Sequence, residues 1–350
     1  MKKVLFILSL FMIFFGCKNP SETPSSELKL NEKTNEFAII IHGGAGTILK
    51  KNMSDEKEAE YKAKLEEAIK VGHTILKNGG TSQEAVMKTI QVMEESPLFN
   101  AGKGAVFTNA GTNELDASFM DGQTLNAGAV AGVKDVKSPI ELAIKVMTNS
   151  EHVMLSGDGA SQFAAAQGLE IVDPRYFFTQ NRFNSLERVK EKEANKTANK
   201  TSAFYDETIK DSKFGTVGCV ALDKNGNIAA GTSTGGMTNK RWGRIGDAPI
   251  IGSGTYANNK TCGVSSTGWG EYFIRSQVAY DISAQMEYQQ KTLKEATADV
   301  IQNKLTNLGG TGGVIALDKN GNMSFEFNTA GMYRASMNDN DELIIKIYKE

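Results

Sequence analysis

A short β-strand organises this chain, and the stretch that predicts it is GTVGCVALD at residues 215–223. Small and apolar residues run along this stretch, which ends at Asp223-Lys224-Asn225-Gly226, and an Asn-Gly pair is typical of a hairpin turn. Residues 191–213, just before it, are rich in Lys, Glu, Asn and Thr and cannot bury enough apolar surface to fold alone. We therefore expect a mobile linker to end where Thr216 begins a buried strand.

Three small-residue turns follow this strand, and each carries a hydroxyl or a charge. They are TSTGGM at 232–237, GRIGD at 243–247 and STGWGE at 266–271. Turns of this kind let backbone N–H groups approach a ligand closely. They indicate a binding or reactive site near Thr216.

The N-terminus has the pattern of an export signal. Lys2-Lys3 precedes an apolar run at 4–15, and Gly16-Cys17 follows. The run is shorter than the ~20 apolar residues that span a bilayer. It resembles a bacterial lipoprotein signal cleaved before Cys17, which predicts a lipidated Cys17, a polar tether at 18–36 and an exported protein, anchored in the membrane or periplasmic. Simple signal cleavage and a buried core helix are the alternatives.

Composition places few further limits on function. The chain has 350 residues, is 40% hydrophobic, and carries a net charge of −2 and 35 glycines, which suits one large domain or two intimate halves. Nothing in it favours nucleic-acid binding, and we expect membrane contact only through a lipid anchor. Cys219 and Cys262 lie on apolar stretches and are expected to be buried hydrophobes, because no spacing typical of metal ligands surrounds them. Whether a metal binds stays open.

Periodicity and capping residues predict the remaining elements. The apolar run 37–41 is expected to be a strand ending in the glycine-rich loop 42–46, which lacks the spacing of a phosphate-binding loop. Strands are also predicted at 114–120, 127–133 and 343–348, and helices at about 61–76, 81–93, 139–148, 161–167 and 272–304. The heptapeptide ALDKNGN occurs at 221–227 and at 316–322, which predicts two similar hairpins, expected as neighbours in one sheet. Strands and helices in blocks favour an antiparallel α+β arrangement.

With these motifs in order, the chain resembles the plant-type asparaginase and isoaspartyl peptidase family of N-terminal nucleophile hydrolases. The resemblance covers residues 37 to about 334. The matching strings are HGGAG (42–46), PLFNAG (97–102), ELDA (114–117), AGAVAG (127–132), GTVG (215–218), TSTGGM (232–237), GRIGD (243–247), YANN (256–259) and NTAGM (328–332). Each string alone is weak evidence, but their order makes chance implausible.

The resemblance implies a fold and a division of the chain. The fold is a four-layer αββα sandwich of two stacked antiparallel sheets flanked by helices, forming one structural domain. Cleavage of the Gly215–Thr216 bond would give an α subunit at 37–215, with a mobile linker at 179–215, and a β subunit at 216–350. Two such αβ pairs are expected to associate as a dimer.

The chemistry can be reasoned from Thr216 itself. A threonine hydroxyl needs an adjacent base, and a threonine at a new N-terminus carries one in its α-amino group, whose reference pKa is about 7.7–8.0. Gly215 leaves the preceding carbonyl unshielded and tolerates a strained backbone. The plainer interpretation is that Thr216 merely begins a strand, and without the surrounding motifs it would be preferred.

The resemblance also implies roles for other residues. Thr234 and Asn100 would assist the nucleophile, and the Thr267 hydroxyl with the Gly268 N–H would form an oxyanion hole, where loss of one donor costs about 10²–10³ in rate. By themselves these residues would be read as turn residues.

Substrate-binding roles follow in the same way. Arg244 offers a planar fork for a carboxylate and Asp247 a partner for an ammonium, with the Gly270 carbonyl as a further acceptor. Elsewhere the two charges would be read as a solvated surface pair. No cofactor is needed for the chemistry, although the loop at 93–103 resembles one that binds a sodium ion through backbone carbonyls.

The expected activity is hydrolysis of isoaspartyl dipeptides and of L-asparagine through a β-aspartyl-enzyme ester. Two alternatives stay open. One is glycosylasparaginase activity on asparagine linked to an N-glycan, which needs an open pocket beyond the scissile amide. The other is a non-catalytic surface lipoprotein that binds amino acids or peptides.

Overall fold

The computed structural model describes residues 35–195 and 215–349. The expected signal, Cys17 and most of the tether lie outside the described residues, as does the segment 196–214. None of the helices in the described part combines the length and apolar character that a membrane span requires.

The larger of two sheets contains eight strands within the described ranges, in the order β12-β11-β1-β5-β6-β2-β3-β4. Neighbours pair antiparallel, apart from the parallel pair β3–β4 at one edge. The bounds are β1 Ala38–Gly46, β2 Leu115–Asp121, β3 Ala127–Val133, β4 Met154–Ser156, β5 Val217–Leu222, β6 Ile228–Thr234, β11 Gly331–Asn338 and β12 Leu343–Tyr348. Strands that precede Thr216 therefore alternate in blocks with strands that follow it: β1 lies between β11 and β5, and β5 and β6 lie between β1 and β2.

The smaller sheet has the order β10-β9-β8-β7 among the described residues, again antiparallel. Its strands are β7 Thr255–Ala257, β8 Cys262–Gly268, β9 Gly312–Asp318 and β10 Met323–Phe327. An apolar layer between the two sheets includes Ile40, Val220, Ile228, Ile315 and Leu317. The two sheets are thus stacked face to face.

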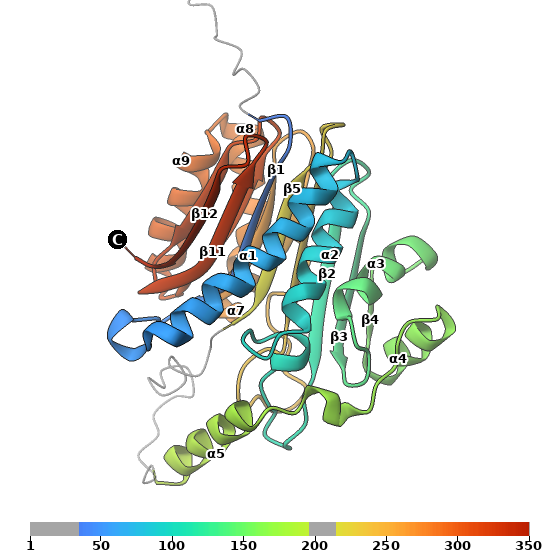
Figure 1. The fold of residues 1–350 in the computed structure, drawn as a ribbon, viewed down its shortest axis with the longest axis vertical. Helices are drawn as coiled ribbons and strands as arrows, with labels where there is room; N and C mark the ends of the chain where they lie inside the picture. Colours follow the sequence, from blue (N-terminus) through green and yellow to red (C-terminus); the bar gives the residue numbers. More distant parts are fainter. Residues whose placement is uncertain (1–34, 196–214, 350) are drawn as a thin grey trace, which may run out of the picture. The chain divides into compact units, whose positions relative to one another are not determined.

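Helices cover the outer face of each sheet, so the expected αββα sandwich is confirmed (Figure 1). On the larger sheet lie α1 Asp55–Lys77, α2 Ser82–Glu94 and α3 Pro139–Asn149; on the smaller lie α7 Gly270–Ser276, α8 Val278–Gln289 and α9 Leu293–Ala298, followed by a π-helical segment Asp299–Leu305. Helix α1 begins at its cap Ser54, and a stripe of Leu65, Ile69 and Leu76 buries its inner face.

The elements predicted from strong local patterns are present. Thr81 accepts the Glu84 N–H at 3.1 Å and opens α2, and Pro139 is the first residue of α3. The helical stretch predicted at 272–304 is broken at Gln277 and Gln290, whose φ angles of 50° and 56° are left-handed. Cys219 and Cys262 are buried free thiols, as expected.

Residues 42–46, expected to be a loop, instead continue strand β1 to Gly46 and pair with β11. Two further expectations need correction. Helix α5, Gln180–Ala194, occupies the N-terminal part of the segment expected to be a linker from residue 179. Arg182 holds it against the preceding chain, donating to the Gly104 carbonyl at 2.9 Å and the Leu98 carbonyl at 3.2 Å. A charge-rich segment can thus be helical, because tertiary contacts supply the stability that its composition lacks.

The last correction concerns the repeated heptapeptide. Its copies do form hairpins of the same build: Asp223 Oδ1 accepts two backbone N–H groups of its turn at 3.0 Å, and Asp318 Oδ1 does the same at 2.9 Å. The hairpins are β5–β6 in the larger sheet and β9–β10 in the smaller one, not neighbours in one sheet. A local turn sequence fixes the hairpin but not the sheet that the hairpin joins.

Candidate active site

Thr216 lies at the entrance of β5, in the middle of the larger sheet between β1 and β6. Its Oγ1 donates to Thr234 Oγ1 at 3.0 Å, and Thr234 ends β6 on the neighbouring strand. The Gly236 N–H also donates to Thr234 Oγ1, at 3.0 Å. The register of β5 and β6 thus places the two threonines together, as the resemblance implied.

The peptide bond before Thr216 is held on its carbonyl side. The Gly215 carbonyl accepts the Asn100 backbone N–H at 3.0 Å. Gly215 has a φ of +120°, and a Cβ there would lie 2.6 Å from the Asn100 Cβ. Gly44 packs against it with a φ of +110°, and a Cβ at Gly44 would lie 2.5 Å from the Gly215 Cα. Only glycine suits either position.

Asn100 is the centre of a hydrogen-bonded loop. Its Nδ2 donates to the Gly236 carbonyl at 2.7 Å, and its Oδ1 accepts the Val106 N–H at 2.9 Å. Its own carbonyl accepts the Gly235 N–H at 3.0 Å. Asn100 therefore fixes the turn after Thr234 and the bond before Thr216 at the same time.

A small cavity of about 20 Å³ opens beside Thr216, which is room for about one water molecule. Its lining contains five residues predicted for the site, Thr216, Thr234, Arg244, Asp247 and Gly268, together with Gly236, Met237, Gly246 and Ala248. The predicted Asn100, Thr267 and Gly270 are not part of this lining. The nucleophile, its threonine neighbour and both charged residues thus share one cavity in the uncut chain.

Asp247 is buried in this cavity with an incomplete set of partners. Its Oδ2 has no hydrogen-bond partner among the described residues. Burial raises the pKa of Asp247 to about 7, against the attraction of the Arg244 charge. Gly270 allows this packing, since a Cβ there would lie 2.8 Å from Asp247 Oδ1. A buried carboxylate oxygen without a donor suits a cationic ligand.

Arg244 has a partner that the sequence did not reveal. Its Nε and Nη2 donate to the two carboxylate oxygens of Glu271 at 3.0 and 2.9 Å, a bidentate pair. Glu271 directly follows Gly270, at the start of α7. Glu271 thus occupies the Nε–Nη2 edge of Arg244, and a ligand carboxylate would either take the Nη1–Nη2 edge or displace Glu271.

Thr267 and Gly268 end β8 in the smaller sheet, facing the cavity region from the opposite layer. Gly268 lines the cavity. The Thr267 hydroxyl accepts the Ala45 N–H at 3.4 Å, which leaves its own proton free to donate. Thr267 is almost fully buried.

The sequence motifs also did not predict a group of charged residues packed next to Thr234 and Gly236. Lys240 Nζ lies 3.8 Å from Asp116 Oδ2 and 3.7 Å from Glu114 Oε2, and Asp116 stands opposite Thr234 in the sheet. Asp116 belongs to the ELDA motif, which suggested a strand without indicating its buried partner. This ion pair supports the turn at Gly236, whose added Cβ would lie 3.1 Å from Lys240 Nζ.

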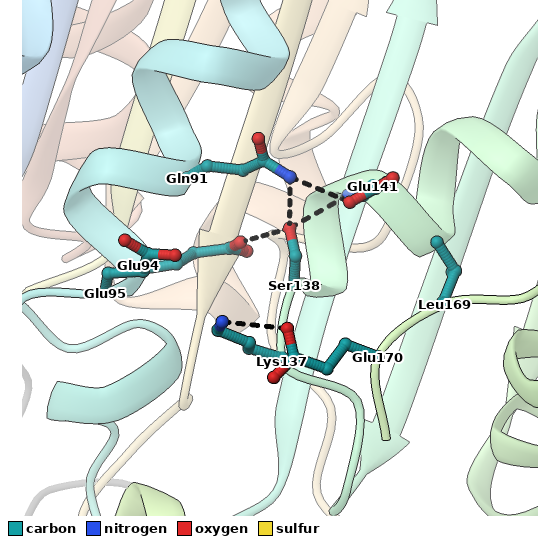
Figure 2. A pocket seen from close by; sticks show the side chains of 8 residues that line it. All are labelled: Gln91, Glu94, Glu95, Lys137, Ser138, Glu141, Leu169 and Glu170. Atoms are coloured by element: carbon teal, nitrogen blue, oxygen red, sulfur yellow. Dashed lines mark hydrogen bonds and ion pairs between the residues drawn. The ribbon is translucent and has the colours of Figure 1, made fainter. Parts of the chain in front are cut away.

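A second hollow, of about 120 Å³, lies on the helical side of the larger sheet between α2 and α3 (Figure 2). Glu94 borders it, and its carboxylate accepts from Ser233, Ser138 and the Ile140 N–H at 2.6 to 3.0 Å. Burial raises the pKa of Glu94 to about 7. Ser233 precedes Thr234 on β6, so the hydrogen bond from Ser233 to Glu94 holds the active-site strand from the helical side of the sheet.

These features define a class of protein. A threonine at the start of a central strand, preceded by a strained glycine in an αββα sandwich, is the arrangement of an N-terminal nucleophile amidohydrolase. The model of a family described as asparaginase matches residues 35–345. The chain belongs to this asparaginase family.

Curated relatives agree with this assignment. The chain is 48% identical to an isoaspartyl peptidase of Escherichia coli, over 89% of this chain and 96% of the relative. It is 48% identical to an isoaspartyl peptidase of Salmonella typhimurium, over 90% and 100%. It is 40% identical to a plant-type L-asparaginase of Thermococcus kodakarensis, over 86% and 96%.

Proposed function

We propose that this protein is a self-cleaving threonine hydrolase of isoaspartyl peptides and L-asparagine. The observation that carries the proposal is the shared cavity, in which the Thr216 hydroxyl and the unpartnered Asp247 Oδ2 lie with Arg244. A hydroxyl, an anion and a cation match the scissile amide, the ammonium and the carboxylate of a β-aspartyl substrate. The names of the relatives at 48% identity support this substrate class.

The first step is cleavage of the chain itself. Thr216 Oγ1 attacks the Gly215 carbonyl carbon, and the carbonyl oxygen gains negative charge that the Asn100 N–H, at 3.0 Å, stabilises. The C–N bond then breaks, the proton passes to the Thr216 nitrogen, and an ester remains. Water hydrolyses the ester, leaving a Gly215 carboxylate and a free Thr216 α-amine.

Substrate hydrolysis repeats this chemistry with an external amide. The Thr216 α-amine accepts the hydroxyl proton while Oγ1 attacks the β-carbonyl of the substrate. Thr267 and Gly268 stabilise the oxyanion, and Thr234 orients the hydroxyl through the 3.0 Å contact. The leaving amine takes the proton, and water then hydrolyses the β-aspartyl ester. Arg244 and Asp247 hold the head group throughout, with the Gly270 carbonyl as a further acceptor.

A substrate panel tests this function. We expect the cleaved protein to hydrolyse β-aspartyl dipeptides and L-asparagine, and to be much less active on an asparagine carrying N-acetylglucosamine, in line with the names of the relatives at 48% identity. Preferred turnover of the glycoasparagine would establish the glycosylasparaginase alternative. Binding without turnover of any of the three would establish the non-catalytic one.

The pH dependence tests the role of Asp247. Its pKa of about 7 means that it becomes neutral, and loses its attraction for an ammonium, as the pH falls below about 7. For L-asparagine, kcat/KM should therefore fall more steeply with decreasing pH than kcat does, since a bound ammonium lowers the pKa of Asp247. Succinamate, which lacks the amine, is the control. Its kcat/KM should fall with decreasing pH only because the Thr216 α-amine becomes protonated. Identical pH profiles for both substrates would contradict this role.

We also propose a structural sodium ion in the loop 93–103. No cluster of three or more His, Cys, Asp or Glu residues suited to a metal occurs in the described ranges, so the ligands would be backbone carbonyls. The loop curls so tightly that added Cβ atoms would lie 2.3 Å from the Glu94 carbonyl oxygen at Gly102, and against the Phe99 carbonyl oxygen at Gly104. The proposal rests on the resemblance of this loop to one that binds sodium through backbone carbonyls. A melting temperature equal in sodium and choline chloride would argue against it.

Export is a further proposal, supported by the sequence pattern at 2–17 alone. The mature chain should begin at Cys17 and carry a lipid there. Cys17→Ala should move the protein from the membrane fraction to the soluble fraction without changing its turnover, which fractionation and mass spectrometry can measure. A cytosolic protein that retains Met1 would contradict this prediction.

We propose finally that two cleaved pairs associate, as the resemblance implies. Light scattering should give twice the mass of one chain.

A further inference from the structure

A buried row of polar residues crosses the larger sheet on the face that meets the smaller sheet. His42 on β1 pairs with Gly218 on β5, Gly218 with Thr232 on β6, and Thr232 with Ser118 on β2. In the smaller sheet, Ser265 on β8 pairs with Thr255 on β7. The five polar side chains are completely buried. They replace the apolar packing that fills the rest of the layer between the sheets.

Gly218 makes room for contact between the polar side chains of the larger sheet and those of the smaller sheet. A Cβ at this position would lie 2.0 Å from Ser265 Oγ and 2.3 Å from His42 Nε2. Because Gly218 has no side chain, Ser265 reaches from the smaller sheet to a point between His42 and Thr232. Its Oγ lies 3.0 Å from His42 Nε2 and 2.7 Å from Thr232 Oγ1.

The hydrogen bonds of this row run in one direction. The Thr216 carbonyl can only accept, so His42 Nδ1, at 2.9 Å, must carry the proton. Burial lowers the pKa of His42 to about 3, although the Thr216 carbonyl opposes this, and the ring is neutral. His42 Nε2 is then an acceptor and takes the Ser265 proton. Ser265 in turn accepts from Thr232 at 2.7 Å, which is shorter than the 3.2 Å from Thr232 Oγ1 to its second acceptor, the Gly254 carbonyl. Thr232 accepts from Thr255 at 2.5 Å.

Both ends of the row reach the active-site cavity. One end is the carbonyl of the nucleophile, Thr216. At the other end Ser118 has one proton for two acceptors, the Ala248 carbonyl at 2.6 Å and Thr255 Oγ1 at 2.8 Å, and shares it between them. Ala248 follows Asp247, and both line the cavity with Thr216.

We propose that His42, Ser265, Thr232, Thr255 and Ser118 form a positioning network that fixes the nucleophile relative to the site for the substrate ammonium. The proposal rests on the proposed function, because it assigns the network a role in that reaction. The network acts through Thr216 and Ala248 and touches no substrate. If the Ser265 hydroxyl turns away, His42 can carry its proton on Nε2, and the Nδ1 lone pair then faces the Thr216 carbonyl. A displacement of about 1 Å in such a site can cost about 10²-fold in rate.

Thr232→Val tests the network at its middle. Valine keeps the shape and removes the hydroxyl. For the cleaved enzyme we expect kcat to fall about 10- to 100-fold, and Thr232→Ser, which keeps the hydroxyl, should restore most of it. Thr297→Val is the matched control: it removes a buried hydroxyl bonded to Ser324 Oγ at 2.9 Å behind the smaller sheet. It should lower the melting temperature similarly and leave kcat unchanged.

Nitrogen-15 NMR of histidine-labelled protein gives a readout independent of turnover. In the wild type, His42 should show a protonated Nδ1 and a hydrogen-bonded, unprotonated Nε2. In Thr232→Val the Nε2 signal should shift as its hydrogen bond weakens, whereas Thr297→Val should not change it. If wild-type kcat persists in Thr232→Val, or Thr297→Val loses as much, the proposal is overturned. If wild-type enzyme hydrolyses none of the substrates, the proposed function fails, and an unchanged His42 signal in Thr232→Val would still refute the network.

Discussion

Thr216→Ala should remain a single chain and hydrolyse no substrate. The substitution removes the hydroxyl that attacks the Gly215 carbonyl, and the amine that would act as base is never released. Purified wild-type protein should split on incubation into two fragments, of which the smaller begins Thr-Val-Gly-Cys. Electrophoresis and N-terminal sequencing measure both outcomes.

Two controls separate chemistry from folding in this experiment. Thr216→Ser keeps a hydroxyl and should cleave at least partly. Thr216→Ala should keep the melting temperature of the uncut wild type, since the Thr216 side chain bonds only to Thr234 among the described contacts. A cut at another bond, or full activity from an uncut chain, would refute the mechanism.

Asp247→Asn and Arg244→Lys should each lower kcat/KM for L-asparagine about 10- to 100-fold. Each removes a charged hydrogen bond to the head group, and such bonds contribute roughly 1.5–3 kcal/mol. Lysine keeps the charge of Arg244 but loses the planar fork. Steady-state kinetics on fully cleaved enzyme measures the effect.

The same two variants should still cleave themselves, because self-cleavage involves no free ammonium or carboxylate. Glu271→Gln is the companion variant: it weakens the bidentate competitor for Arg244 and should lower KM or leave it unchanged. Unchanged substrate kinetics in both Asp247→Asn and Arg244→Lys would remove these residues from the site.

Local patterns predicted most elements because their causes are local. The Asn-Gly turn after β5, the cap Thr81 and the first-turn Pro139 each act within a few residues. Helix α5 was missed because its stability comes from elsewhere: only Leu186 is buried in it, and Arg182 binds carbonyls 78 and 84 residues earlier in the chain. The sequence of the repeated turn also does not predict which sheet each hairpin joins.

Motifs located the site, but not the contacts that complete it. Thr216, Thr234, Arg244 and Asp247 were predicted and line one cavity. The pairing of Arg244 with Glu271 depends on how the loop before α7 folds back. The bond from His42 to the Thr216 carbonyl joins residues 174 apart, and only the register of β1 with β5 brings them together.

The order of strands in the larger sheet affects how the cleaved protein could refold. After the proposed cut, β1 would belong to one polypeptide and both of its neighbours, β5 and β11, to the other. Renaturation would then require two separate molecules to meet and interleave, so its rate would depend on protein concentration, whereas the precursor folds as one molecule. Cleavage would thus replace the folding of one molecule by the assembly of two, and the lifetime of the cleaved enzyme would depend on how slowly it unfolds rather than on its equilibrium stability.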